Sequence, residues 1–181
     1  MTDSPLFKDL HEESLESSIG DLTFNENTRN YTFPFIHGGI AYFAYFSTVE
    51  DSSEGLTSSS LQDALNQDCP GILIGKNPFF MKFGLAEETD SKLMFAKKQT
   101  KIKSGMFVQL PQKFKLMIKE LSEKVELDNL FFLAGSDDDK HHNRLILWYK
   151  RITDRIVSSD IGFEILYFNH EAGIYGYKRI N

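Results

Sequence analysis

The stretch Ile40–Val49, with the sequence IAYFAYFSTV, is apolar at both its odd and its even positions. Successive residues of a β-strand point to opposite faces of the sheet, so this strand would present apolar side chains on both faces. Such a strand belongs inside a sheet that is covered on both sides. Gly38 and Gly39 before it, and the polar run Glu50–Gly55 after it, bound it at strand length. We therefore predict that Ile40–Val49 is an interior strand around which the sheet is built.

Further strand signals lie on both sides of this stretch. Tyr31–Ile36 and Leu130–Ala134 are short apolar runs followed by glycine-containing turns, and Pro78 opens a run with one strongly apolar face. Two more strand-like segments close the chain and are joined by a short polar loop. The predicted C-terminal hairpin consists of Phe163–Phe168 and Ile174–Lys178.

Three segments have the apolar period of a helix. Pro111 begins the clearest one, in which apolar residues recur at i, i+3, i+4, i+7 and i+11. The same pattern follows Asp139, and Thr57–Gln67 carries a shorter apolar stripe behind serines that can cap a helix. The stripes are Phe114, Met117, Ile118, Leu121 and Val125 in the first helix, Leu145, Trp148, Tyr149, Ile152 and Ile156 in the second, and Leu61, Ala64 and Leu65 in the short one.

The order of these elements is dominated by hairpins and short loops. We predict an α+β fold in which a mostly antiparallel sheet packs against two long amphipathic helices and one short helix. At 181 residues the chain suits one domain, which we place at residues 31–181. Residues 1–30 are acidic and serine-rich, and we expect them to form an acidic N-terminal arm or a docking helix.

The composition indicates a soluble intracellular protein. A single cysteine, Cys69, rules out an internal disulfide, and the first residues contain neither a basic region nor an apolar one of the kind found in secretory signals. The longest apolar run is interrupted by Pro34, His37 and two glycines, so no transmembrane segment is predicted. We expect a cytoplasmic, reducing location.

Positive charge is concentrated in one part of the chain. Ser91–Lys119 contains eight lysines and no acidic residue; because the whole chain has a formal net charge of −6, the other residues together carry −14. We expect Leu93–Leu110 to form a hairpin that turns at Ser104 and Gly105, and its lysines have two interpretations. They either protect a sheet edge from aggregation or form a cationic face that attracts an anionic partner. The candidate binding residues are Lys97, Lys98, Lys101, Lys103, Lys113 and Lys115.

A second candidate site is the run from Asp137 to His142, which lies between a predicted strand and a predicted helix. Asp137, Asp139 and His141 offer oxygen and nitrogen ligands for a metal ion. The alternative is structural, because aspartates cap helix N-termini and complement the helix dipole without any ligand. Neighbouring His141 and His142 also point about 100° apart on a helix, so they cannot both face one site.

We predict a non-catalytic binding module, such as an adaptor, an inhibitor or an immunity-type protein, which binds an acidic or phosphorylated protein partner through its lysine-rich face. The alternative is a small metal-dependent enzyme that acts on a phosphorylated substrate through Asp137, Asp139 and His141. No cofactor is predicted. Nucleic acid is not favoured, because the phenylalanines beside the lysines alternate like core residues. A Cys69 nucleophile is not favoured either, since no protease signature surrounds it.

Overall fold

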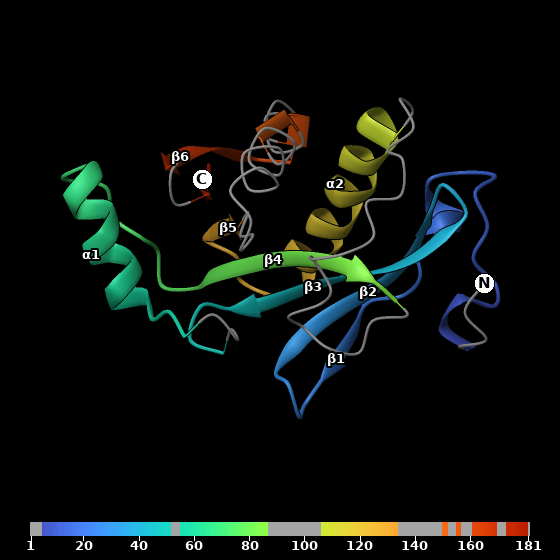
Figure 1. Cartoon of the computed structure of the whole chain (residues 1–181). Helices are drawn as coiled ribbons and strands as arrows, with labels where there is room; N and C mark the ends of the chain where they lie inside the picture. Colours follow the sequence, from blue (N-terminus) through green and yellow to red (C-terminus); the bar gives the residue numbers. More distant parts are fainter. Residues whose placement is uncertain are drawn as a thin grey trace.

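The computed structural model describes residues 5–51, 55–86, 106–133, 150–151, 155–156, 161–169 and 173–180 (Figure 1). Within these ranges the strands form one seven-stranded sheet of order β1-β2-β3-β4-β5-β7-β6. The elements are η1 (Pro5–Phe7), η2 (Glu16–Ser18), β1 (Thr23–Asn25), β2 (Asn30–His37), β3 (Ile40–Thr48), α1 (Ser58–Asp68), β4 (Pro78–Leu85), α2 (Met106–Lys124), β5 (Asn129–Leu133), β6 (Phe163–Asn169) and β7 (Ile174–Arg179).

One pair of strands in this sheet is parallel. β4 and β5 run in the same direction with Pro78 opposite Asn129 and Met81 opposite Phe132, whereas the other pairings among the described strands are antiparallel. Parallel strands need a crossover connection, and α2 lies in the one between β4 and β5. The α+β class is confirmed in its coarse form, as a mixed domain of sheet and helices. The second long helix was predicted over residues that lie mostly outside the described ranges.

β3 is an interior strand, as the sequence predicts, and it pairs with β2 on one side and β4 on the other. Its two faces are buried to different degrees. Ala44 and Phe46 are completely buried, whereas Phe43 and Tyr45 on the opposite face are half-buried. α2 covers the first face with its apolar stripe. On the second face, partial burial raises the pKa of the Tyr45 hydroxyl to about 12.

α1 packs against the other face of the sheet at the end far from the N-terminal segment (Figure 1). Its Leu61 and Leu65 are buried against Phe80 and Phe131. These two leucines belong to the narrow apolar stripe of the short helix. Thr57 caps the helix by accepting a hydrogen bond from the Ser60 N–H, and the Ser60 hydroxyl accepts one from the Thr57 N–H. The predicted short helix is therefore confirmed, with its cap one residue earlier than the serines.

The prediction of a hairpin is wrong for its second half. Met106–Leu110 was expected to be the returning strand, but these residues form the first turns of α2, which contains Pro111. The apolar stripe explains the difference, because Leu110 lies four residues before Phe114 and is buried in the same cluster. Pro111 lies beyond the first turn of this 19-residue helix, so its missing N–H removes one i→i−4 hydrogen bond. No helix in the described part of the chain has the length and apolarity needed to span a bilayer.

The segment before β2 is attached to the sheet at several points. Phe7 of η1 is buried and meets Phe43 edge-on, with ring centroids 5.1 Å apart. The Gly20 N–H donates to the Pro34 carbonyl at 2.8 Å, and Ile19 makes a single antiparallel bridge to Phe35. Parts of the segment from Pro5 to Asn30 therefore contact the sheet, and Thr23–Asn25 form its first strand.

Candidate functional site

Several strand ends meet at one edge of the sheet. β4 ends opposite the start of β3, where Leu85 pairs with Tyr42, and β5 ends beside β4 because the two strands are parallel. The turn from β2 to β3, formed by Gly38 and Gly39, lies at the same edge. We call this the carboxyl edge, meaning the ends of β4 and β5 together with that turn. In open α/β sheets with parallel strands, ligands bind in the crevice outside the carboxyl ends of the strands, at the point where the strand order reverses.

The chain segments that contain most of the predicted site residues leave the sheet at the carboxyl edge. The chain from Ala86 to Met106 contains Lys97, Lys98, Lys101 and Lys103, and the chain after Leu133 contains Asp137, Asp139 and His141. These seven residues lie outside the described ranges, so their side chains are not placed. Since β4 and β5 are adjacent, the two segments nevertheless leave the sheet from neighbouring strands.

The last lysines of the segment are close to α2 in the sequence. Lys103 precedes Met106 by three residues and Lys101 by five. The N-terminal end of a helix carries a partial positive charge and unpaired N–H groups.

Lys113 is not an exposed member of the predicted binding set. Its side chain is only 2% exposed, and its ammonium group donates to the Ile36 carbonyl and lies 3.5 Å from Glu12 Oε1. Burial lowers the pKa of the Lys113 ammonium, and the Glu12 carboxylate partly offsets this effect. Lys115, two residues further along α2, is half-buried.

Glu12 binds the turn between β2 and β3 with both of its carboxylate oxygens. The Gly38 N–H donates to Oε1 and the Gly39 N–H donates to Oε2, each at 2.8 Å. Both glycines have positive φ, 62° and 74°, as the favoured two-residue hairpin turn requires. Partial burial raises the pKa of the Glu12 carboxyl, but the two amides, Lys113 and His37 outweigh it, so the net shift is downward.

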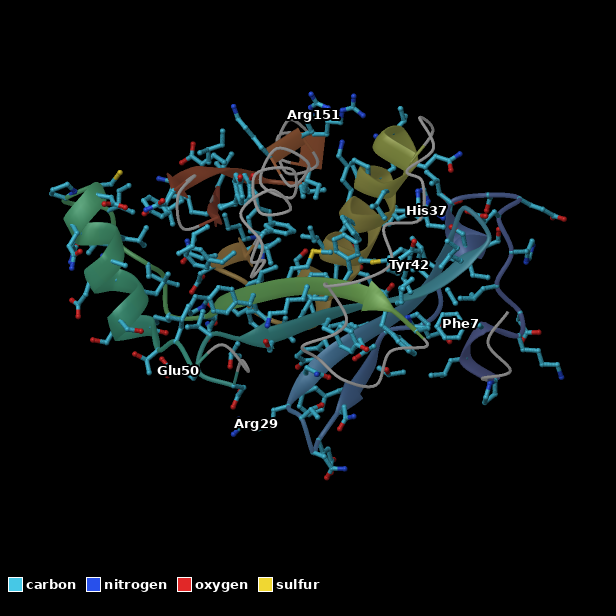
Figure 2. All side chains as sticks on the ribbon, viewed as in Figure 1. Phe7, Arg29, His37, Tyr42, Glu50 and Arg151 are labelled. Atoms are coloured by element: carbon cyan, nitrogen blue, oxygen red, sulfur yellow. The ribbon has the colours of Figure 1, made fainter. Side chains whose placement is uncertain are left out.

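His37 completes this group at the end of β2, close to α2 and the N-terminal segment (Figure 2). It is 2% exposed, and neither ring nitrogen has a hydrogen-bond partner among the described residues. Burial, and then the charge of Lys113, lower the pKa of the imidazole, while Glu12 acts in the opposite direction. The lowered pKa favours the neutral ring, and its two unpaired nitrogens are unusual for a buried polar side chain.

The sequence contained one overlooked sign of this cluster. Lys113 lies three residues after Leu110 and four before Met117, so it occupies the apolar stripe of α2. A charged residue at such a position predicts a buried partner, although nothing local identifies Glu12, which is 101 residues away. No group of three or more histidine, cysteine or acidic residues suited to a metal ion occurs in the part of the chain that the structure describes. No protein-family model, curated protein sequence or solved structure matches this chain.

Proposed function

We propose that this protein is a binding module that engages an acidic or phosphorylated partner at the carboxyl edge. The observation that carries the proposal is the parallel β4–α2–β5 unit, whose helix follows directly after the lysine-rich segment. Lys97, Lys98, Lys101 and Lys103 would supply the positive charge, and Lys115 lies further along the same helix.

Two physical effects would favour an anion at this edge. Helix N-termini favour anions because their first N–H groups have no partner within the helix and their dipole is positive there. Clustered lysines add a field that attracts anions and raises the rate of association. The competing interpretation, in which the lysines protect a sheet edge, loses support because Met106–Leu110 is helical and the expected returning strand is absent.

A small metal-dependent enzyme is the second candidate. The position of β5 favours it, because Asp137, Asp139 and His141 follow a strand whose neighbour leads into the lysine segment. A divalent ion held by carboxylate and imidazole ligands next to lysines would suit a phosphorylated substrate. The metal would polarise the phosphoryl group while the lysines neutralised its charge.

The binding proposal can be tested with inorganic pyrophosphate as the probe, measured by calorimetry at low and at high salt. We expect salt-dependent binding, and we expect Lys101→Glu with Lys103→Glu to weaken it at least about tenfold. The matched control is Lys76→Glu with Lys178→Glu, two exposed lysines at the opposite edge of the sheet. No measurable binding, or equal weakening by both pairs of substitutions, would contradict the proposal.

The two candidate functions are separated by metal content. The binding module predicts no stoichiometric metal in purified protein and unchanged pyrophosphate binding after His141→Ala. Bound Zn²⁺ or Mn²⁺ that is lost in both Asp137→Ala and His141→Ala would instead support the metal-dependent enzyme.

A further inference from the structure

We propose that the turn between β2 and β3, together with Lys113, forms a carboxylate-binding cradle for an acidic peptide of a partner protein, and that Glu12 occupies it as an internal ligand. The cradle consists of the Gly38 and Gly39 N–H groups and the Lys113 ammonium, with His37 beside them. It uses none of the lysines in the segment before α2. The cradle can therefore be tested separately from the proposed anion site at the carboxyl edge, for which pyrophosphate is the probe.

Three donors converge on one carboxylate in this arrangement. The two glycine N–H groups each donate to a different oxygen of Glu12 at 2.8 Å, and the Lys113 ammonium lies 3.5 Å from Oε1. Two N–H groups from successive residues match the two oxygens of a planar carboxylate, and the nearby ammonium adds charge to one of those bonds. The outer side of the turn is open, because a Cβ atom built on either glycine would meet nothing within 4 Å.

The buried lysine makes the cradle depend on an anion. A buried ammonium that loses its partner carries a large desolvation cost, so a negative group close by stabilises the charged form of Lys113. The Ile36 carbonyl accepts one of its hydrogen bonds but supplies no charge. If Glu12 leaves, the favourable replacement is another carboxylate in the same place.

Glu12 is held in a way that permits exchange. Its side chain is 32% exposed, and its neighbours Lys8, Asp9, His11, Glu13 and Ser14 are exposed. The hydrogen bonds of this stretch are mostly local, such as those between Ser14 and Ser17, whereas the attachments to the sheet lie outside it at Phe7, Ile19 and Gly20. A peptide that carries a glutamate or aspartate can therefore compete with Glu12 without unfolding the sheet.

The first experiment asks whether free acetate replaces the missing side chain in the full-length Glu12→Ala variant. We expect acetate to raise its melting temperature by about 3–5 °C at ten times the acetate Kd, relative to chloride at equal ionic strength. The Gly38 and Gly39 amide resonances should return toward their wild-type positions. The control is Glu13→Ala, which removes an equal charge from a side chain that is 87% exposed, and which should show no acetate effect.

Two results would overturn the cradle. One is an equal effect of acetate and chloride on Glu12→Ala. The other is a larger effect of phosphate than of acetate, which would reject a carboxylate as the natural ligand. Glu12→Ala retains Lys113 and the turn, and the amide resonances report whether the fold persists.

The second experiment tests competition by the internal ligand. Hexaglutamate should bind Glu12→Ala at least about tenfold more tightly than it binds wild type or Glu13→Ala, because only the first variant lacks the competing carboxylate. Binding through the lysine segment would be the same in all three proteins. Equal affinities across the three would therefore reject the role of Glu12 without bearing on the pyrophosphate site.

Discussion

The two faces of the sheet differ in how they are covered. On one face, α2 lies across the strands, and residues such as Ala44, Phe46 and Phe114 are completely buried. On the other face, Phe43 and Tyr45 are half-buried, and the N-terminal segment covers them in part through Phe7. The strand β3 is equally apolar on both faces, so its sequence does not create this difference. The elements that cover each face create it, because α1 buries the second face only beyond Phe43 and Tyr45, and we expect the β3 side chains beneath α2 to contribute more to stability than these two.

The largest expected effect is that of Phe46→Ala. Its ring is completely buried and meets Phe33 edge-on, with centroids 5.9 Å apart. Removing a buried phenylalanine costs about 3–5 kcal/mol, a large part of the stability of a domain. Denaturant unfolding of the variant measures this loss. A loss below about 1 kcal/mol would contradict the expected difference between the two faces, because it would mean that residues on the α2 face repack around the missing ring as easily as those on the other face.

Phe43→Ala on the opposite face should cost less. Full burial of β3 on both faces would predict about 3–5 kcal/mol for this substitution as well, but the half-buried ring reduces our expectation to about 1–2 kcal/mol. The contact with Phe7 can be isolated by a double-mutant cycle. We expect Phe7→Ala and Phe43→Ala to couple by about 0.5–1.5 kcal/mol, as aromatic pairs do. Strictly additive losses would show that the N-terminal segment does not support this face.

The sequence predicted local elements better than their arrangement. Periodicity located β3, the C-terminal hairpin and the buried stripe of α2, because burial of one face imposes a repeating pattern. The parallel β4–β5 pair was missed, since the pattern within a strand does not reveal which strand lies beside it. The start of α2 was misplaced because Pro111 was taken as the first helical residue, although Leu110 continues the stripe.

For the candidate sites, too, the sequence showed local patterns but not their arrangement in space. The lysine segment and the Asp137–His142 run were visible as local compositions, and only the topology places their origins at one edge. The Glu12 contact joins residues that are far apart in the sequence, and two of its donors are backbone N–H groups. Any residue other than proline supplies such a group, so side-chain chemistry could not identify it.

The carboxylate of Glu12 gives the N-terminal segment a pH dependence. Its pKa in the folded protein lies below the ordinary value of 4.5, so its contribution to stability is complete above that pH and is lost as the pH falls through the folded pKa. His37 acts in a higher window, because its folded pKa lies below 6.5 and the unfolded chain takes up the proton first. Urea midpoints between pH 7 and pH 3 should therefore fall in two stages.

Two variants test whether Glu12 and His37 cause these two stages of stability loss. Glu12→Gln should remove the part of the loss below about pH 4.5, and His37→Asn should remove the part that begins near pH 6.5. Retention of both stages in both variants would assign the acid sensitivity to other groups. The contribution of the N-terminal segment would then come from contacts that do not titrate, such as that of Phe7 with Phe43.

The smallest expected effect concerns charge on the outer side of α2. Lys124 and Glu120 form a closer ion pair than Lys113 and Glu12, 2.7 Å against 3.5 Å, but both of its side chains are well exposed. An exposed i, i+4 pair contributes only about 0.3–0.5 kcal/mol, because water and salt screen it. We therefore expect Glu120→Gln to change the unfolding free energy by no more than that, and the change to vanish in high salt. A loss as large as that of Phe43→Ala would mean that charge on the helix surface, rather than burial beneath it, separates the two faces of the sheet.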